Sequence, residues 1–360
     1  MNEPQPSYPQ LRALGHRLFG PVCAPPIMWM AEMISQRPDR PVLFLSREGF
    51  HLRRLVAECL PLLRLPAPPL EYLVVSRTLV FRLLLATEEG WRLGLAAHYS
   101  GTLESLMRER FGLTAEEIAA LDLPSPPASL NLPNERDQAL VADILATRRE
   151  VLRPTLLRRL DAYRAHVDRL SRSGPFTVVD IGYSGTIQKG LAALLPNELD
   201  GLYFFLLGDS AGRGSTIEAS AFWKGRGGFG SGDPLIDLSL VLESVLTAPD
   251  GQVVDIDPDM GDSRTEGFVY REGVQVQKLF HITYAIMDGV LDFIRDMAHG
   301  GISPHSVQDI FDVGSTYQNL LRLDQSEEMM FLRKFCEVDD AISGLGVINP
   351  FSFLPGLRAQ

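Results

Sequence analysis

Four short segments of this chain are almost wholly apolar, and polar or glycine residues follow each of them. They are residues 41–46, 72–75, 176–180 and 202–207. Short runs that are apolar on both faces are typical of parallel strands that helices cover on both sides. Helical periodicity follows the first run at 49–63 and the third at 184–195, which makes two βαβ units. The sequence therefore predicts an α/β fold with an open, parallel, Rossmann-like sheet.

The two units are separated by residues 79–172, whose pattern is helical except at 123–129, where prolines stop any helix. We expect this stretch to be an inserted helical subdomain that folds over the carboxyl edge of the sheet as a lid or hood. The α/β core then consists of residues 1–78 and 173–260. Residues 261–360 are expected to form a C-terminal helical region.

Near the N-terminus, residues 11–37 are expected to form two short helices, broken at Gly20-Pro21, because proline removes a helical hydrogen bond. Later helices are expected at 235–246 and 274–297, where apolar residues recur at helical spacing.

The charge of the chain argues against a nucleic-acid partner. Lys and Arg total 34 against 45 Asp and Glu, whereas binding to a phosphate backbone requires a basic surplus. Cys23, Cys59 and Cys336 are far apart, which fits a reducing compartment better than a disulfide framework. No run reaches the roughly 18 uncharged apolar residues of a spanning helix, and the first residues contain no cationic leader. We therefore expect a cytoplasmic protein without a transmembrane segment.

Polar residues follow three of the predicted strands, at 46–49, 76–77 and 180–188. In an open α/β sheet, ligands bind beyond the carboxyl ends of the strands. Because these three segments are predicted to meet at that edge, they are the strongest functional signal in the sequence.

The segment 180–188 has the pattern of a phosphate-binding turn. Gly182 and Gly185 lie between a strand and a helix, so the first N–H groups of that helix can face an anion beside the hydroxyls of Ser184 and Thr186. The alternative is an ordinary helix N-cap without a ligand. The candidate phosphate-binding residues are Gly182, Tyr183, Ser184, Gly185, Thr186, Ile187 and Gln188.

Arg47 and Arg77 follow neighbouring strands, and their guanidinium groups suit a diphosphate or a carboxylate. Surface salt bridges are the alternative, and Glu48 is one available partner. Asp180 could bind Mg²⁺ through water, accept hydrogen bonds from sugar hydroxyls, or be structural. The candidate catalytic residues are Arg47, Arg77 and Asp180, and the candidate diphosphate loop comprises Ser46, Arg47, Glu48, Gly49, Ser76 and Arg77.

Residues 176–194, an apolar strand followed by Asp180 and the Ser184-Gly185-Thr186 turn, resemble the 5-phosphoribosyl diphosphate loop of type I phosphoribosyltransferases. In that family two acidic residues end the strand and a Thr-Gly-x-Thr turn holds the 5-phosphate. Asp180 matches the second acid, Val179 stands in the place of the first, and Thr186 comes one position early. The resemblance implies a phosphoribosyltransferase-like fold, with Mg²⁺ and 5-phosphoribosyl diphosphate as its ligands.

Segments 14–21, 44–50 and 72–77 resemble a second group of proteins. This is the domain found downstream of a haloacid-dehalogenase-like phosphatase in bacterial cell-surface polysaccharide clusters, and such proteins are commonly labelled dehalogenase-superfamily hydrolases. The hydrolase requires a nucleophilic Asp after the first strand. Here Ser46-Arg47-Glu48 occupies that place, so an aspartyl-phosphate cannot form there.

These resemblances imply an enzyme that transfers phosphoribose from 5-phosphoribosyl diphosphate to a sugar acceptor, either a glycan or a lipid-linked sugar. A separate phosphatase of the dehalogenase type is the implied protein partner. The alternative is a non-catalytic protein that binds phosphate or a nucleotide. A dehalogenase-like phosphatase is the third possibility, which Ser46 disfavours.

Overall fold

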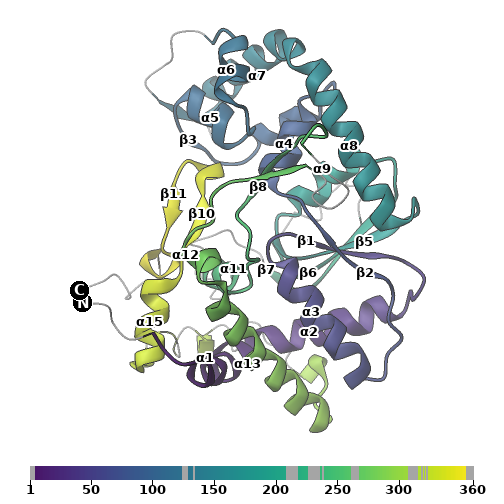
Figure 1. Cartoon of the computed structure of the whole chain (residues 1–360), viewed down its shortest axis with the longest axis vertical. Helices are drawn as coiled ribbons and strands as arrows, with labels where there is room; N and C mark the ends of the chain where they lie inside the picture. The colour runs from purple at the N-terminus through teal and green to yellow at the C-terminus, as the bar shows by residue number, and fades with distance from the viewer. Residues whose placement is uncertain are drawn as a thin grey trace.

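The structure is a computed structural model that describes residues 5–123, 129–132, 134–207, 218–225, 236, 239–260, 267–306, 315–317, 319, 321 and 323–353. At its centre a five-stranded, all-parallel sheet lies between helices (Figure 1). The α/β class and the open parallel sheet predicted from the sequence are confirmed.

The strands are arranged in the order β2-β1-β5-β6-β7. Their bounds are Val42–Leu45 for β1, Leu70–Leu73 for β2, Phe176–Tyr183 for β5, Leu199–Leu207 for β6 and Ala219–Gly225 for β7. All four predicted strands are present and parallel, so their carboxyl ends lie at one edge of the sheet. In the middle of the sheet, Phe44 lies opposite Tyr72 on one side and Val179 on the other.

Two features of the sheet differ from the sequence prediction. Strand β2 begins and ends two residues earlier than 72–75, and β7 was not predicted at all. Most residues of both strands are only half-buried, so neither contains the continuous apolar run that marks a strand covered on both faces.

Helices cover both faces of the sheet. On one face, α2 (Gly20–Ser35) and α3 (Gly49–Leu62) pack on an apolar core that includes Phe44 and Val179. On the other face, α4 (Arg77–Leu84), α8 (Arg153–Ser171) and α9 (Thr186–Leu194) pack against Leu43 and Val178. Successive side chains of a strand point to opposite faces of the sheet. Leu43 and Val178 therefore belong to one apolar core, and Phe44 and Val179 to the other.

The predicted break at Gly20-Pro21 is wrong. Helix α1 (Tyr8–Leu14), a π-helical turn at Gly15–Phe19 and α2 follow one another without interruption. Pro21 comes directly after the π-helical turn, in which the Gly20 N–H donates to the Gly15 carbonyl, and the continuous helix loses only the one hydrogen bond that Pro21 cannot donate. The turn also brings Gly15 so close to α13 (Phe280–His299) that a Cβ there would lie 1.9 Å from the Ile286 carbonyl oxygen.

Residues 79–172 are mainly helical, as expected, and lie partly beyond the sheet in Figure 1. Besides α4 and α8 they contain α5 (Leu103–Glu109), α6 (Ala115–Ala120), α7 (Glu135–Arg148) and a two-stranded ribbon, β3 (Ser100–Gly101) with β4 (Leu130–Asn131). Their apolar side chains share one core with Leu43 and Leu45 of the sheet. Most of the proline-containing segment lies outside the described residues.

The C-terminal part combines helices with small strands. It contains α11 (Ser239–Val245), α12 (Gln275–Lys278), α13, α15 (Glu327–Phe335), and two hairpins, β8 (Val253–Ile256) with β9 (Phe268–Tyr270) and β10 (Val338–Asp340) with β11 (Gly346–Ile348). The helices predicted at 235–246 and 274–297 correspond to α11 and to α12 with α13. The α/β core was expected to end at residue 260, but β8 lies before this position and pairs with β9, which lies after it.

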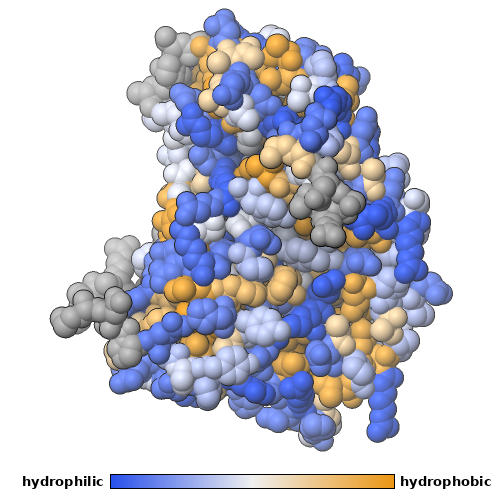
Figure 2. Space-filling model, viewed as in Figure 1, coloured by the Kyte–Doolittle hydropathy of each residue, from blue (hydrophilic) through white to orange (hydrophobic). Residues whose placement is uncertain are grey.

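Hydrophilic and hydrophobic side chains are interspersed on the face of the molecule shown in Figure 2. Within the described residues, none of the helices has both the length and the apolar character needed to cross a bilayer.

A buried ion-pair network joins three helices of the helical stretch to β8. The side chain of Arg82 in α4 has no exposed surface and contacts Glu117 at 2.7 Å and Asp255 at 2.7 Å. Arg159 of α8 contacts the same two carboxylates, at 2.9 and 3.2 Å. Because buried charges are costly unless each is paired, this network specifies how α4, α6, α8 and β8 fit together.

Replacing Arg82 with Ala should strongly destabilise the protein, since it leaves Glu117 and Asp255 buried with only Arg159 to neutralise both. We expect the free energy of unfolding to fall by about 3 kcal/mol in urea denaturation. Arg92→Ala is the matched control, because the Arg92 side chain is 55% exposed and pairs with Glu89 at the surface, and it should cost less than about 1 kcal/mol. Equal losses in the two variants would contradict this role for Arg82.

Candidate functional site

A polar cavity of about 160 Å³ lies at the carboxyl edge of the sheet. The three polar segments predicted to meet there, at 46–48, 76–77 and 180–187, all line it. The remaining lining residues come from other parts of the chain and are Val75, Glu243, Gln252, Val253 and Asp339. The described residues that line the cavity include none from 79–172, the stretch expected to act as a lid. Residues of α11, β8 and β10 line the cavity beside the three predicted segments.

Two of the predicted site residues, Gly49 and Gln188, do not line the cavity. Gly49 begins α3, where a Cβ would lie 2.6 Å from the backbone of Phe44. The buried side chain of Gln188 donates to the Glu218 carbonyl and accepts from the Tyr203 hydroxyl at 2.7 Å. Both residues therefore support the cavity from behind.

The two serines at the strand ends use their hydroxyls within the fold. Ser46 Oγ donates to the Val75 carbonyl at 2.5 Å and accepts from the Val75 N–H. Ser76 Oγ donates to the Val253 carbonyl and, as the N-cap of α4, accepts from the Leu79 N–H. These bonds hold the backbone next to Arg47 and Arg77, and they attach β8 to the rim of the cavity.

The guanidinium groups of Arg47 and Arg77 have no carboxylate within 4 Å among the described residues. Glu48, the available partner, instead accepts the backbone N–H of Arg47 at 3.1 Å. Within the described part of the chain, Arg47 and Arg77 therefore do not form the surface salt bridges that were the alternative interpretation. Two cations that face a cavity without a carboxylate partner suit an anionic ligand.

The end of β5 and the turn into α9 have an unusual backbone. Gly182, Tyr183 and Gly185 have positive φ angles of 119°, 87° and 61°. Gly185 is the N-cap of α9, and no side chain caps that helix. The hydroxyls of Ser184 and Thr186 lie 2.8 Å from each other rather than on backbone N–H groups. The first turn of α9 therefore keeps the uncapped N–H groups that an anion site requires.

Carboxylate side chains, among them those of Asp180 and Glu243, also line the cavity. Burial, with repulsion from Glu48 and Glu243, holds the pKa of Asp180 well above its usual value, although Asp180 accepts the Ile181 N–H at 2.8 Å. Burial and Glu48 raise the pKa of Glu243 to about 7, against the opposing effect of Arg77 and Arg47. The sequence analysis missed Glu243. The available signal was a single carboxylate within the apolar helix α11.

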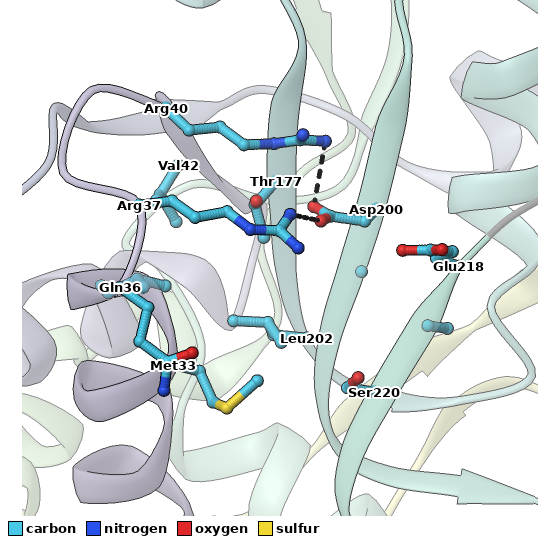
Figure 3. A pocket seen from close by; sticks show the side chains of 13 residues that line it. Met33, Gln36, Arg37, Arg40, Val42, Thr177, Asp200, Leu202, Glu218 and Ser220 are labelled. Atoms are coloured by element: carbon cyan, nitrogen blue, oxygen red, sulfur yellow. Dashed lines mark hydrogen bonds and ion pairs between the residues drawn. The ribbon is translucent and has the colours of Figure 1, made fainter.

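A second cavity, of about 90 Å³, lies at the amino edge of the sheet (Figure 3). Its arginines, Arg37 and Arg40, both point toward Asp200, at 2.6 and 3.4 Å. Because this carboxylate offsets their charge, the amino-edge cavity is less suited to an anion than the carboxyl-edge cavity.

Comparison with known proteins adds no assignment: no protein-family model matches the chain, and no curated protein matches it. The functional argument therefore depends on the geometry of the carboxyl-edge cavity and on the motifs within it.

The two glycines of the loop should differ in their tolerance of a side chain. At Gly182 a Cβ would lie 2.1 Å from the Phe205 carbonyl oxygen, whereas at Gly185 the nearest atom is 3.8 Å away. Gly182→Ala should lower the free energy of unfolding by roughly 3 kcal/mol, and Gly185→Ala by about 1 kcal/mol of backbone strain alone. Urea denaturation measures both, and a larger loss at Gly185 would show that the loop is built differently.

The raised pKa of Glu243 makes stability depend on pH. Between its ordinary value of 4.5 and about 7, the folded protein binds more protons than the unfolded chain, so the free energy of unfolding falls as pH rises through this window. Asp180 shifts in the same direction. Glu243→Gln should remove this fall, so the gain in stability over the wild-type protein should be about 3 kcal/mol larger at pH 7 than at pH 4.5. Glu198→Gln, at an 80% exposed side chain, should leave the pH dependence measured by urea denaturation unchanged.

Proposed function

We propose that this protein binds 5-phosphoribosyl diphosphate at the carboxyl-edge cavity and transfers phosphoribose to a sugar acceptor. The observation that carries the proposal is the presence of Arg47, Arg77 and the uncapped start of α9 around one cavity. A ligand with a phosphate at one end and a diphosphate at the other matches two anion-binding elements that line one cavity together with a carboxylate, Asp180.

The residues have distinct parts in this proposal. The segment from Gly182 to Ile187, with the N–H groups of α9, holds the 5-phosphate and fixes the position of the ribose, and Gln188 supports it from behind. Arg47 and Arg77 stabilise the negative charge that develops on the leaving diphosphate. Asp180 interacts with the ribose hydroxyls or with water bound to a metal ion.

The carboxylate of Asp180 is suited to a hard cation, because oxygen atoms are the ligands that such cations prefer. Within the described residues no three Asp, Glu, His or Cys side chains form a group that could hold a metal ion. Mg²⁺ would therefore need oxygen ligands from the diphosphate itself, with Asp180 acting through water. When bound there, the ion would neutralise charge on the diphosphate.

The proposed acceptor is a glycan or a lipid-linked sugar of bacterial cell-surface assembly. A separate dehalogenase-like phosphatase would be the protein partner, and the reaction would take place in the cytoplasm. These assignments depend on the resemblance of segments 14–21, 44–50 and 72–77 to the polysaccharide-cluster domain.

A second candidate is a protein that binds a phosphate ligand without catalysis. It is favoured by Val179, the residue in the place of the family's first acid, which is fully buried in the core and does not line the cavity. A phosphatase that uses Ser46 is disfavoured, since the Ser46 hydroxyl already bonds to Val75 in both directions.

Isothermal titration with 5-phosphoribosyl diphosphate, with and without Mg²⁺, tests the proposal. We expect binding that Mg²⁺ strengthens, and that Arg47→Ala weakens by about 2 kcal/mol, as for a lost charge-assisted hydrogen bond. Arg37→Ala, at the amino edge, is the control and should bind normally. Binding of inorganic phosphate without binding of the diphosphate donor would favour the non-catalytic candidate. Phosphatase turnover that Ser46→Ala abolishes would overturn the proposal.

A further inference from the structure

Glu243 differs from the other carboxylates that line the cavity in having no hydrogen-bond donor among the described residues. Glu48 accepts the Arg47 N–H, and Asp180 accepts the Ile181 N–H. Asp339 accepts the Ala341 N–H and lies 3.7 Å from an Arg271 nitrogen. The carboxylate of Glu243 is therefore the one that remains available to accept a proton from a ligand.

The position of Glu243 is well determined by its helix. Its neighbours Val241, Leu242 and Val245 are fully buried in the core beneath the cavity. Helix α11 also contacts α13 and β10. Glu243 therefore lines the cavity from α11, an element separate from the segments that contain Arg47, Arg77 and Asp180.

The charged groups around Glu243 come from several elements. Glu48 at the start of α3, Asp180 of β5 and Asp340 of β10 repel its charge, whereas Arg47 and Arg77 attract it. With burial, the balance places the pKa of Glu243 at about 7. A carboxylate in this range is half ionised near neutral pH and accepts a proton more readily than an exposed Glu.

We propose that Glu243 is the general base that removes the proton from the acceptor hydroxyl during phosphoribosyl transfer. This inference rests on the function proposed above. It assigns the acceptor to the side of the cavity formed by α11.

The step balances without a further reactant. The acceptor oxygen forms a bond to the anomeric carbon of the ribose while the bond from that carbon to the diphosphate oxygen breaks and its electron pair leaves with the diphosphate. The proton of the acceptor hydroxyl passes to Glu243 and then to solvent. Water in the place of the acceptor gives ribose 5-phosphate and diphosphate by the same step.

The test measures diphosphate release from 5-phosphoribosyl diphosphate with water as the acceptor and Mg²⁺ present, from pH 5 to 9, beside titration of donor binding. We expect kcat of the wild-type protein to rise with pH and level off above about 7. Glu243→Gln should bind the donor within threefold of wild type, lose at least 100-fold in kcat and lose this pH dependence. In Glu243→Ala, added formate should restore part of the rate.

Glu198→Gln is the matched control, because it removes an exposed carboxylate at the opposite edge of the sheet, and its kcat should be unchanged. If Glu243→Gln keeps full kcat, Glu243 is not the base, although donor binding still supports the proposed function. Donor binding by the wild-type protein without diphosphate release at any pH would also overturn this inference. If the wild-type protein does not bind the donor, the proposed function itself fails.

Discussion

The fold depends on the burial of charge between Arg82, Arg159, Glu117 and Asp255. A guanidinium without exposed surface is tolerated only where carboxylates surround it, so the network allows one arrangement of its four elements. One of them, α4, begins with Arg77, and another, β8, provides Val253 at the cavity. The same network that joins the helical stretch to β8 therefore also helps to position two elements that line the cavity.

The carboxyl-edge cavity brings opposite charges together without pairing them. Arg47 and Arg77 have no carboxylate partner in the described part of the chain, while burial and the nearby charge of Glu48 raise the pKa of both Asp180 and Glu243. Such an arrangement costs stability, since each group would gain from a partner of opposite sign. Unrelieved charge of both signs in one cavity is expected where a ligand supplies the missing partners.

The core strands of the sheet were predictable because burial on both faces requires continuous apolar residues, as in Leu43 and Phe44. The edge strand β7 was not, because half-buried strands have no such requirement. The segments that meet at the cavity were predictable for a related reason, since the carboxyl ends of parallel strands share an edge. Glu243 was not predictable in this way. It lies in a helix far along the chain, and only packing brings it to the same cavity.

What the sequence by itself determined is local: that four segments form strands of the central sheet, that Gly182 and Gly185 make a turn before a helix, and that Ser46 cannot act as an aspartyl nucleophile. These follow from backbone sterics and side-chain chemistry, which act over a few residues. Tertiary structure alone decided which charges remain unpaired and which elements close the cavity. Burial and electrostatic interaction depend on distance in space, and the chain brings Arg47 and Glu243 to one cavity only when the whole core has formed.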